Sequence, residues 1–291
     1  MANTQSVSLV LGSGGARGMA HIGVIHWLEE NGYEIKSISG CSMGALIGGI
    51  YAAGKLDIYE RWLLSISRLE IIALLDLSWG KSGLVKGDKI INTLVNLVGD
   101  QKIEDLPVNF TAVASDLKAE KEVWINSGRL FDAIRASISL PLFFTPFDYN
   151  GTLLIDGGVL NPVPIAPTFG DSTDLTIAVN LGGPSVQIDD QAGIQKNPPV
   201  QDSLIKQNIN RFIKRLQQSV KSTEKKDWGV YDVAIQAFEA MQSTIARQKL
   251  AAYPPDLTIE IARNACKILE FDRAEEMIKL GYTKAKLAGL S

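Results

Sequence analysis

The chain has 291 residues, of which 46% are hydrophobic and 21% are charged. This composition excludes general intrinsic disorder and supplies enough apolar residues for one large domain or two small ones. The formal net charge of -3 gives no global attraction to a nucleic-acid backbone, so we expect no nucleic-acid partner. With two cysteines, Cys41 and Cys266, and two histidines, His21 and His26, we expect no disulfide framework, no metal and no cofactor.

The sequence also gives an expectation about location. No basic segment followed by a long apolar run opens the chain, which predicts the absence of a secretory signal. The longest weakly polar stretch, residues 45–54, is about half the ~20 residues that a bilayer crossing needs, and glycines interrupt it. We therefore expect a cytoplasmic protein with no membrane-spanning segment.

The first half of the chain alternates strand-like and helix-like segments. The pattern predicts a strand over 6–11, a helix over 19–32, a strand over 35–39 and a buried helix over 45–54. This alternation implies parallel strands joined by right-handed crossovers. Short apolar runs predict further strands over 109–117, 121–126, 151–156, 174–181 and 255–261. The expected fold class is α/β, with one mostly parallel sheet of about six strands and helices on both faces.

The second half contains a long loop followed by helices. Gly, Pro, Gln and Asp are frequent over 182–202, which predicts a surface loop. Helices are predicted over 203–221 and 230–251, and from Asp272 to Leu287. We favour a single domain over 1–291, with a helical C-terminal elaboration at about 203–291, over a division into two domains.

A G-x-S-x-G pattern lies between the predicted strand 35–39 and the predicted helix 45–54. Its residues are Gly40, Cys41, Ser42, Met43 and Gly44. A strand, a sharp turn and a helix form the context of a nucleophile elbow, which exposes a serine hydroxyl at the carboxyl edge of a sheet. Ser42 is therefore the candidate nucleophile.

A serine nucleophile needs a base, and the positions of the histidines restrict its identity. In α/β-hydrolases the chain order is serine, acid, histidine, but His21 and His26 both precede Ser42. We interpret both histidines as ordinary packing residues. A carboxylate within hydrogen-bond reach of Ser42 is then the expected base.

The candidate carboxylate is Asp156, which ends an apolar predicted strand and is followed by Gly157 and Gly158. A carboxylate at the end of a buried strand is costly unless it has a partner. The alternative interpretation of this DGG segment is a structural Asx turn.

A second glycine-rich turn, residues 11–18, follows the first predicted strand; we call it the glycine loop. It contains Gly14, Gly15, Ala16, Arg17 and Gly18, and its backbone N–H groups are able to hold a phosphate or a developing oxyanion. Arg17 has three interpretations: it orients the loop, it meets an anionic head group, or it forms a structural ion pair.

Two nucleotide-binding motifs are excluded. The dinucleotide fingerprint needs a glycine where the chain has Arg17, and an acid at the end of the second strand, where it has Ser39 and Gly40. A P-loop needs a glycine where Leu75 precedes the GKS segment at residues 80–82.

The glycine loop, the G-x-S-x-G pattern, ASISLP at 136–141 and DGG at 156–158 occur in an order that resembles the patatin-like phospholipases. The resemblance is greater to their bacterial RssA-type branch and covers about residues 7–182. The closing segment FDRAEEMIKLGYTKA is also similar to that branch. The sequence departs from the family pattern at Ser13, where many members have glycine.

The resemblance implies a three-layer patatin-like sandwich and a catalytic dyad of Ser42 and Asp156 without histidine. It implies that the glycine loop, with Gly14 and Gly15 retained, supplies the oxyanion hole. The expected function is a serine lipid acyl hydrolase of the phospholipase, lysophospholipase or esterase type, with an acyl-ester lipid as substrate. The alternative is a regulatory or partner-binding protein with weak or vestigial hydrolysis.

The predicted helix over 203–221 combines apolar residues at helical spacing with five basic residues, Lys206, Arg211, Lys214, Arg215 and Lys221. A basic amphipathic helix is able to lie on an anionic bilayer, which would place the protein peripherally on the inner face of the membrane. The interpretation we favour is that the apolar stripe packs against the core.

Overall fold

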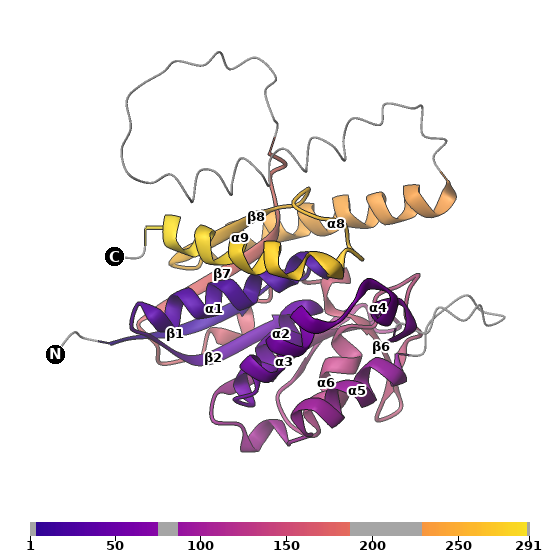
Figure 1. Cartoon of the computed structure of the whole chain (residues 1–291), viewed down its shortest axis with the longest axis horizontal. Coiled ribbons are helices and arrows are strands. Elements are labelled where there is room, and N and C mark those ends of the chain that lie inside the picture. Colours follow the sequence, from indigo (N-terminus) through magenta and orange to yellow (C-terminus); the bar gives the residue numbers. More distant parts are fainter. Residues whose placement is uncertain (1–3, 75–86, 187–228, 290–291) are drawn as a thin grey trace, which may run out of the picture.

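The computed structural model describes residues 4–74, 87–186 and 229–289 (Figure 1). The predicted basic helix over 203–221 and the GKS segment at 80–82 lie outside these ranges, as does most of the predicted loop over 182–202. The membrane hypothesis for that helix therefore stays a prediction.

A mixed, mostly parallel sheet forms the centre of the molecule. Its strands are β1 (Gln5–Leu11), β2 (Tyr33–Cys41), β3 (Asn109–Asp116), β4 (Lys121–Ile125), β5 (Phe147–Tyr149), β6 (Thr152–Asp156), β7 (Leu175–Gly183) and β8 (Leu257–Ala262). Hydrogen-bonded neighbours follow the sequence β5-β6-β3-β2-β1-β7-β8, and β4 also pairs with β3. The strands from β3 to β8 in this order run parallel, whereas β4 and β6 are antiparallel to β3 and β5 is antiparallel to β6. The expected α/β class is confirmed, with eight strands in the described part of the chain instead of about six.

Strands β2 and β6 meet end to end along one edge of β3. At the carboxyl end of β2, Cys41 pairs with Val113 of β3. The next β3 residue, Ala114, pairs with Asp156 at the carboxyl end of β6. Strand β4 occupies the other edge, because it pairs with β3 throughout Ala112–Asp116. The carboxyl ends of β2 and β6 therefore face each other, although the two strands run in opposite directions.

The described helices are α1 (Ala20–Glu30), α2 (Met43–Ala52), α3 (Leu56–Ser65), α4 (Arg68–Leu74), α5 (Asp88–Val98), α6 (Leu130–Ser137), α8 (Val230–Ala252) and α9 (Ala274–Leu287). The predicted helices over 230–251 and 272–287 are confirmed to within two residues as α8 and α9. The predicted helix over 19–32 is present as α1, and a short 3-10 turn, Gly15–Met19, directly precedes it. None of the described helices has both the length and the apolar character to cross a bilayer.

The alternating side chains of β1 divide the core into two parts. Val7, Leu9 and Leu11 belong to a large apolar cluster that includes α1, α2, α6 and α9. Val10 belongs to a smaller cluster, in which Ala246 of α8 packs. Helices thus cover both faces of the sheet, as expected, and Figure 1 shows α8 and α9 beside β7 and β8.

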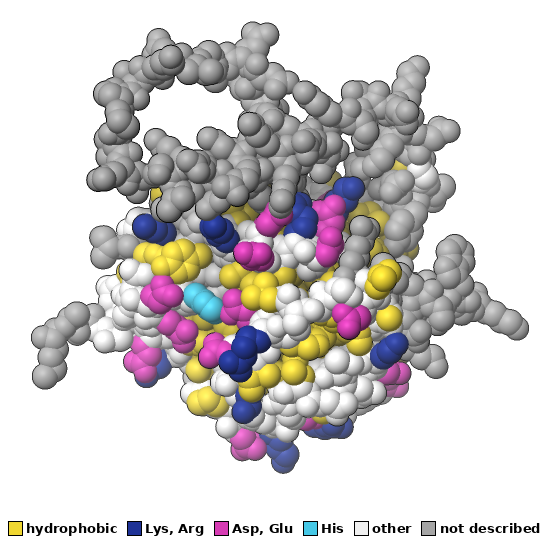
Figure 2. All heavy atoms as spheres, viewed as in Figure 1, with side chains coloured by type: hydrophobic (Ala, Val, Ile, Leu, Met, Phe, Trp, Pro, Cys, Tyr) yellow, Lys and Arg dark blue, Asp and Glu magenta, His cyan; other side chains and the backbone are white. Residues whose placement is uncertain are grey.

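Helices α1 and α9 are in backbone contact. A Cβ at Gly23 would lie 1.8 Å from the carbonyl oxygen of Ile278, and one at Gly281 would lie 1.9 Å from that of Ala20. Helix α9 is therefore packed directly against α1, with glycines at the points of contact. On the face seen in Figure 2, acidic and basic side chains are interspersed between apolar ones.

Candidate active site

The turn between β2 and α2 holds Ser42 in a strained conformation. Its backbone has φ 53° and ψ −124°, at a positive φ that a residue with a Cβ rarely adopts. Glycines allow the close packing around it: a Cβ at Gly40 would lie 2.5 Å from the oxygen of Gly44, and one at Gly44 would lie 2.0 Å from that of Leu11. The predicted elbow geometry is present.

The ASISLP segment links this turn to β3 through the side chain of Ser137. The amide of Ser42 donates a hydrogen bond to Ser137 Oγ at 3.0 Å, and Ser137 Oγ donates to the carbonyl oxygen of Val113 at 2.6 Å. Ser137 is fully buried. It was part of a motif in the sequence, but only the structure shows that it holds the elbow.

Asp156 lies at the facing strand end and is fully buried. Its Oδ1 accepts a hydrogen bond from the amide of Gly158 at 2.8 Å, so the turn expected as a structural alternative is present; we call Asp156–Gly158 the aspartate turn. A Cβ at Gly157 would lie 2.0 Å from the oxygen of Val113, so the turn lies directly against β3.

The buried carboxyl group has an unusual affinity for protons. Burial raises the pKa of Asp156 from its ordinary value of 3.8 to about 7, and hydrogen bonding from Ser42 and Gly158 opposes this rise. Oδ2 has no hydrogen bond of regular geometry within the described ranges. Hydrogen bonds of catalytic groups are often long or poorly aligned before substrate binds, so this geometry does not exclude Asp156 as a base.

The glycine loop lies beside the elbow. A Cβ at Gly18 would lie 2.3 Å from Met43 Cβ, which shows how closely the loop packs against the start of α2. The amides of Ser13 and Ala16 donate to the carbonyl oxygens of Pro162 and Ile268, both at 2.8 Å. Within the described part of the chain, the amides of Gly14 and Gly15 donate no hydrogen bond to a backbone carbonyl.

Arg17 is a structural residue of this loop. Its side chain is 5% exposed; Nε donates to the carbonyl oxygen of Gly14 at 3.1 Å, and the guanidinium also pairs with Glu239 Oε1 at 2.9 Å and bonds the carbonyl of Arg263. The interpretations as a loop-orienting residue and as a structural ion pair are both confirmed. The interpretation as a contact for an anionic head group is wrong, because the group is buried and bonded within the protein.

His21 is a packing residue, as expected, whereas His26 is partly exposed and lies beside a carboxylate. His21 is fully buried, with Nε2 2.9 Å from the carbonyl oxygen of Gly12, and burial lowers its pKa to about 4. His26 lies 3.0 Å from Glu60 on α3. Cys41, inside the G-x-S-x-G pattern, is also buried, and burial raises the pKa of its thiol, so it remains protonated.

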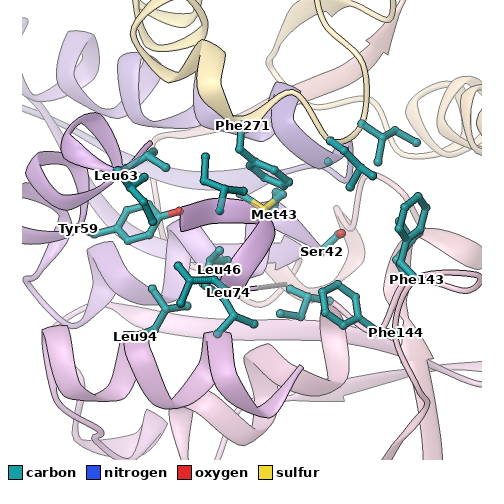
Figure 3. Close-up of a pocket in the computed structure, with 18 of the residues that line it drawn as sticks. Ser42, Met43, Leu46, Tyr59, Leu63, Leu74, Leu94, Phe143, Phe144 and Phe271 are labelled. Carbon is teal, nitrogen blue, oxygen red and sulfur yellow. The ribbon is translucent and has the colours of Figure 1, made fainter. Parts of the chain in front are cut away.

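An apolar cavity of about 130 Å³ opens on Ser42. Within the described residues, no charged side chain lines it. In Figure 3, Phe143 and Phe144 lie on one side of Ser42, while Leu63 and Tyr59 of α3 lie on the other. Helices α3, α4 and α5 supply much of this lining and were not predicted, although the spacing of Tyr59 and Leu63, and of Ile90 and Leu94, is helical.

Across the described ranges, no group of three or more His, Cys, Asp or Glu side chains is arranged to hold a metal ion.

Comparison with known proteins identifies a family for the chain. The family model of the patatin-like phospholipases matches residues 9–169. Uncharacterized NTE family proteins of Mycobacterium bovis and Mycobacterium tuberculosis are each 36% identical, over 97% of this chain and 91% of theirs. Lysophospholipase NTE1 of Saccharomyces cerevisiae is 32% identical over 61% of this chain, which spans only 11% of that protein.

A solved structure, VipD from Legionella pneumophila, is similar with a TM-score of 0.46 and 17% identity, covering 98% of this chain and 66% of that one. The family assignment is independent of this likeness, since the family model covers more than half of the chain. The chain belongs to the patatin-like phospholipase family.

Proposed function

We propose that the protein is a serine lipid acyl hydrolase that cleaves fatty-acyl esters through a dyad of Ser42 and Asp156. The observation that carries this proposal is the meeting of three features: a strained serine, a buried carboxylate with a pKa near 7, and an apolar cavity that opens on the serine. Family membership makes hydrolysis by a serine nucleophile the expected chemistry.

The reaction we propose starts with proton transfer from Ser42 Oγ to Asp156 Oδ2 as Oγ attacks the ester carbonyl carbon. In this proposal the amides of Gly14 and Gly15 stabilise the tetrahedral oxyanion. On collapse, the C–O bond to the alcohol breaks and Asp156 gives its proton to the leaving oxygen. Water then attacks the acyl-enzyme, Asp156 takes the proton of the water, and the proton returns to Ser42 Oγ as the fatty acid is released.

The cavity supports an acyl chain as the part of the substrate that is bound. Its described lining has no charge and includes the buried side chains of Leu46, Leu63 and Leu94. Each CH₂ group of an alkyl chain that is buried there would therefore make the binding free energy more favourable by about 0.8 kcal/mol. The name of the yeast relative makes a lysophospholipid the first substrate class to test.

Placement in the RssA-type branch and a cytoplasmic location are further parts of this proposal. The alternative, a partner-binding protein with vestigial hydrolysis, differs in its reactivity. A fluorophosphonate probe with mass-spectrometric mapping should label Ser42 in the wild type and nothing in Ser42→Ala. Ser65→Ala, which changes a serine on the exposed end of α3, is the matched control and should label like the wild type.

Hydrolysis itself should be measured on lysophospholipid, diacyl phospholipid and a short soluble ester. Ser42-dependent release of fatty acid from any of them would support the enzyme. A wild-type protein that neither reacts with the probe nor releases fatty acid would favour the partner-binding alternative.

A further inference from the structure

We propose that Gln242 of α8 is a positioning residue that holds the glycine loop in register with the aspartate turn. The proposal rests on the function proposed for Ser42 and Asp156. Within the described residues Gln242 forms no hydrogen bond with either of them, so we infer that it acts through the two loops.

Three groups from distant parts of the chain meet where the glycine loop and the aspartate turn lie against each other. Gln242 Nε2 donates to Ser13 Oγ at 3.3 Å, across 229 residues of sequence, and the Gln242 side chain is buried. A Cβ at Gly158 would lie 2.4 Å from Gln242 Nε2 and 2.6 Å from Ser13 Oγ. The amide group of Gln242 is thus packed against both the glycine loop and the aspartate turn.

Helix α8 is tied to the same two loops on either side of Gln242. One turn earlier, Glu239 pairs with Arg17 of the glycine loop at 2.9 Å. Two turns later, Lys249 pairs with Glu122 at 2.6 Å, and Glu122 accepts a hydrogen bond at 2.9 Å from Asn161.

Asn161 closes the connection, because its backbone N–H donates to the carbonyl oxygen of Gly157 at 2.8 Å. Residues 239, 242 and 249 recur at helical spacing and lie on one face of α8. The helix therefore spans from one loop to the other, with Gln242 at the point where they touch.

The consequences for the reaction follow from what each loop carries. Ser13 directly precedes Gly14 and Gly15, so a shift of Ser13 moves the donors that face the oxyanion. Gly158 gives its N–H to Asp156 Oδ1, and this hydrogen bond lowers the pKa of the base. Loss of the Gln242 amide should therefore affect the transition state and the base more than the binding of an acyl chain.

The experiment compares Gln242→Ala with Gln248→Ala, the same change at an exposed position of the same helix. We expect kcat on a soluble ester to fall about 10-fold in Gln242→Ala, as for the loss of one buried hydrogen bond, with KM changed less than about twofold. The acid limb of the kcat profile should move to higher pH. Gln248→Ala should match the wild type in all three readouts.

A double-mutant cycle with Ser13→Ala provides a second, less disruptive variant. If the two side chains act as one unit, Ser13→Ala should also lower kcat, and the double variant should lose little more than either single one. Full multiplication of the two losses would show that the hydrogen bond does not couple them.

Hydrogen–deuterium exchange provides a readout that needs no activity. Peptides containing residues 12–18 and 157–161 should exchange faster in Gln242→Ala than in Gln248→Ala. Equal exchange in the two variants would overturn the proposal, as would an unchanged kcat and pH profile. A wild type without Ser42-dependent reactivity would refute the proposed function, and the exchange result would still decide the role of Gln242.

Discussion

Replacing Asp156 by asparagine should make the protein inactive and more stable at the same time. The amide cannot accept the Ser42 proton, and neither histidine is placed to substitute, so turnover should fall by at least about 10³-fold. The gain in stability has a separate origin. The asparagine side chain would keep the hydrogen bond from Gly158, but the change would remove a carboxyl group that is costly to ionise in the folded protein.

The size of this gain depends on pH. The pKa of Asp156 is about 7 in the folded protein against an ordinary 3.8, so between these values the folded state holds a proton that the unfolded state has lost. The free energy of unfolding of the wild type should therefore fall as pH rises from about 4 to 7 and then level off. The Asp156→Asn change removes this contribution, which amounts to about 2 kcal/mol at pH 5 and about 4 kcal/mol at pH 8.

The assay is urea denaturation of both proteins at pH 5 and pH 8. Asp148→Asn, the same chemical change on the exposed part of β5, is the control and should show no such pH-dependent difference from the wild type. An equal stability difference between Asp156→Asn and the wild type at the two pH values would refute the claim that burial poises this carboxyl group. It would also remove the reason for treating Asp156 as a base near neutral pH.

Further expectations concern the serine, the glycine loop and the buried histidine. Ser42→Ala and Ser42→Gly should both abolish turnover. The glycine variant should have a free energy of unfolding about 1 kcal/mol higher than the alanine variant, because glycine tolerates φ 53°. Equal melting curves of the two variants would argue against strain at the elbow. Gly15→Ala should lower the acylation rate by about 10²-fold, since φ is +56° and a Cβ would lie 2.7 Å from the carbonyl oxygen of Ile268; stopped-flow acylation at the wild-type rate would contradict the oxyanion assignment. His21→Ala should lose stability, measured by urea denaturation, yet keep far more activity than Asp156→Asn; a folded His21→Ala as inactive as that variant would refute a dyad without histidine. The kcat of the wild type should rise with pH through about 7, as Asp156 loses its proton, and a flat pH–rate profile between pH 5 and 8 would exclude it as the base.

The sequence predicted the elements that have strong local patterns. The strands from β1 to β4 and from β6 to β8 were all anticipated, because each is a short apolar run bounded by turn residues. Strand β5 was missed, since three residues are too few for a periodic pattern. The single domain over 1–291 stays a prediction.

The candidate site residues could be proposed from residue types and their order along the chain. Because no histidine follows Ser42, the sequence pointed to a carboxylate as the base. In the structure Cys41, which precedes Ser42, pairs with Val113 of β3, and Asp156 pairs with the next β3 residue, Ala114. The antiparallel direction of β6 was not predictable, because the apolar pattern of a strand is the same in both directions. Contacts such as Ser13 with Gln242 were also beyond sequence reasoning, since they join positions 229 residues apart.

Because β2 and β6 meet end to end along one edge of β3, that edge sets the spacing between the two candidate catalytic residues. Val113 sets the position of one strand end and Ala114 sets the other, so the spacing between serine and aspartate follows from a single step of this third strand. An extra residue inserted between Val113 and Ala114 would lengthen that step by about 3.3 Å, more than the reach of a hydrogen bond. In the proposed reaction, the distance over which a proton would move is thus set by a strand that contributes neither of the two candidate side chains.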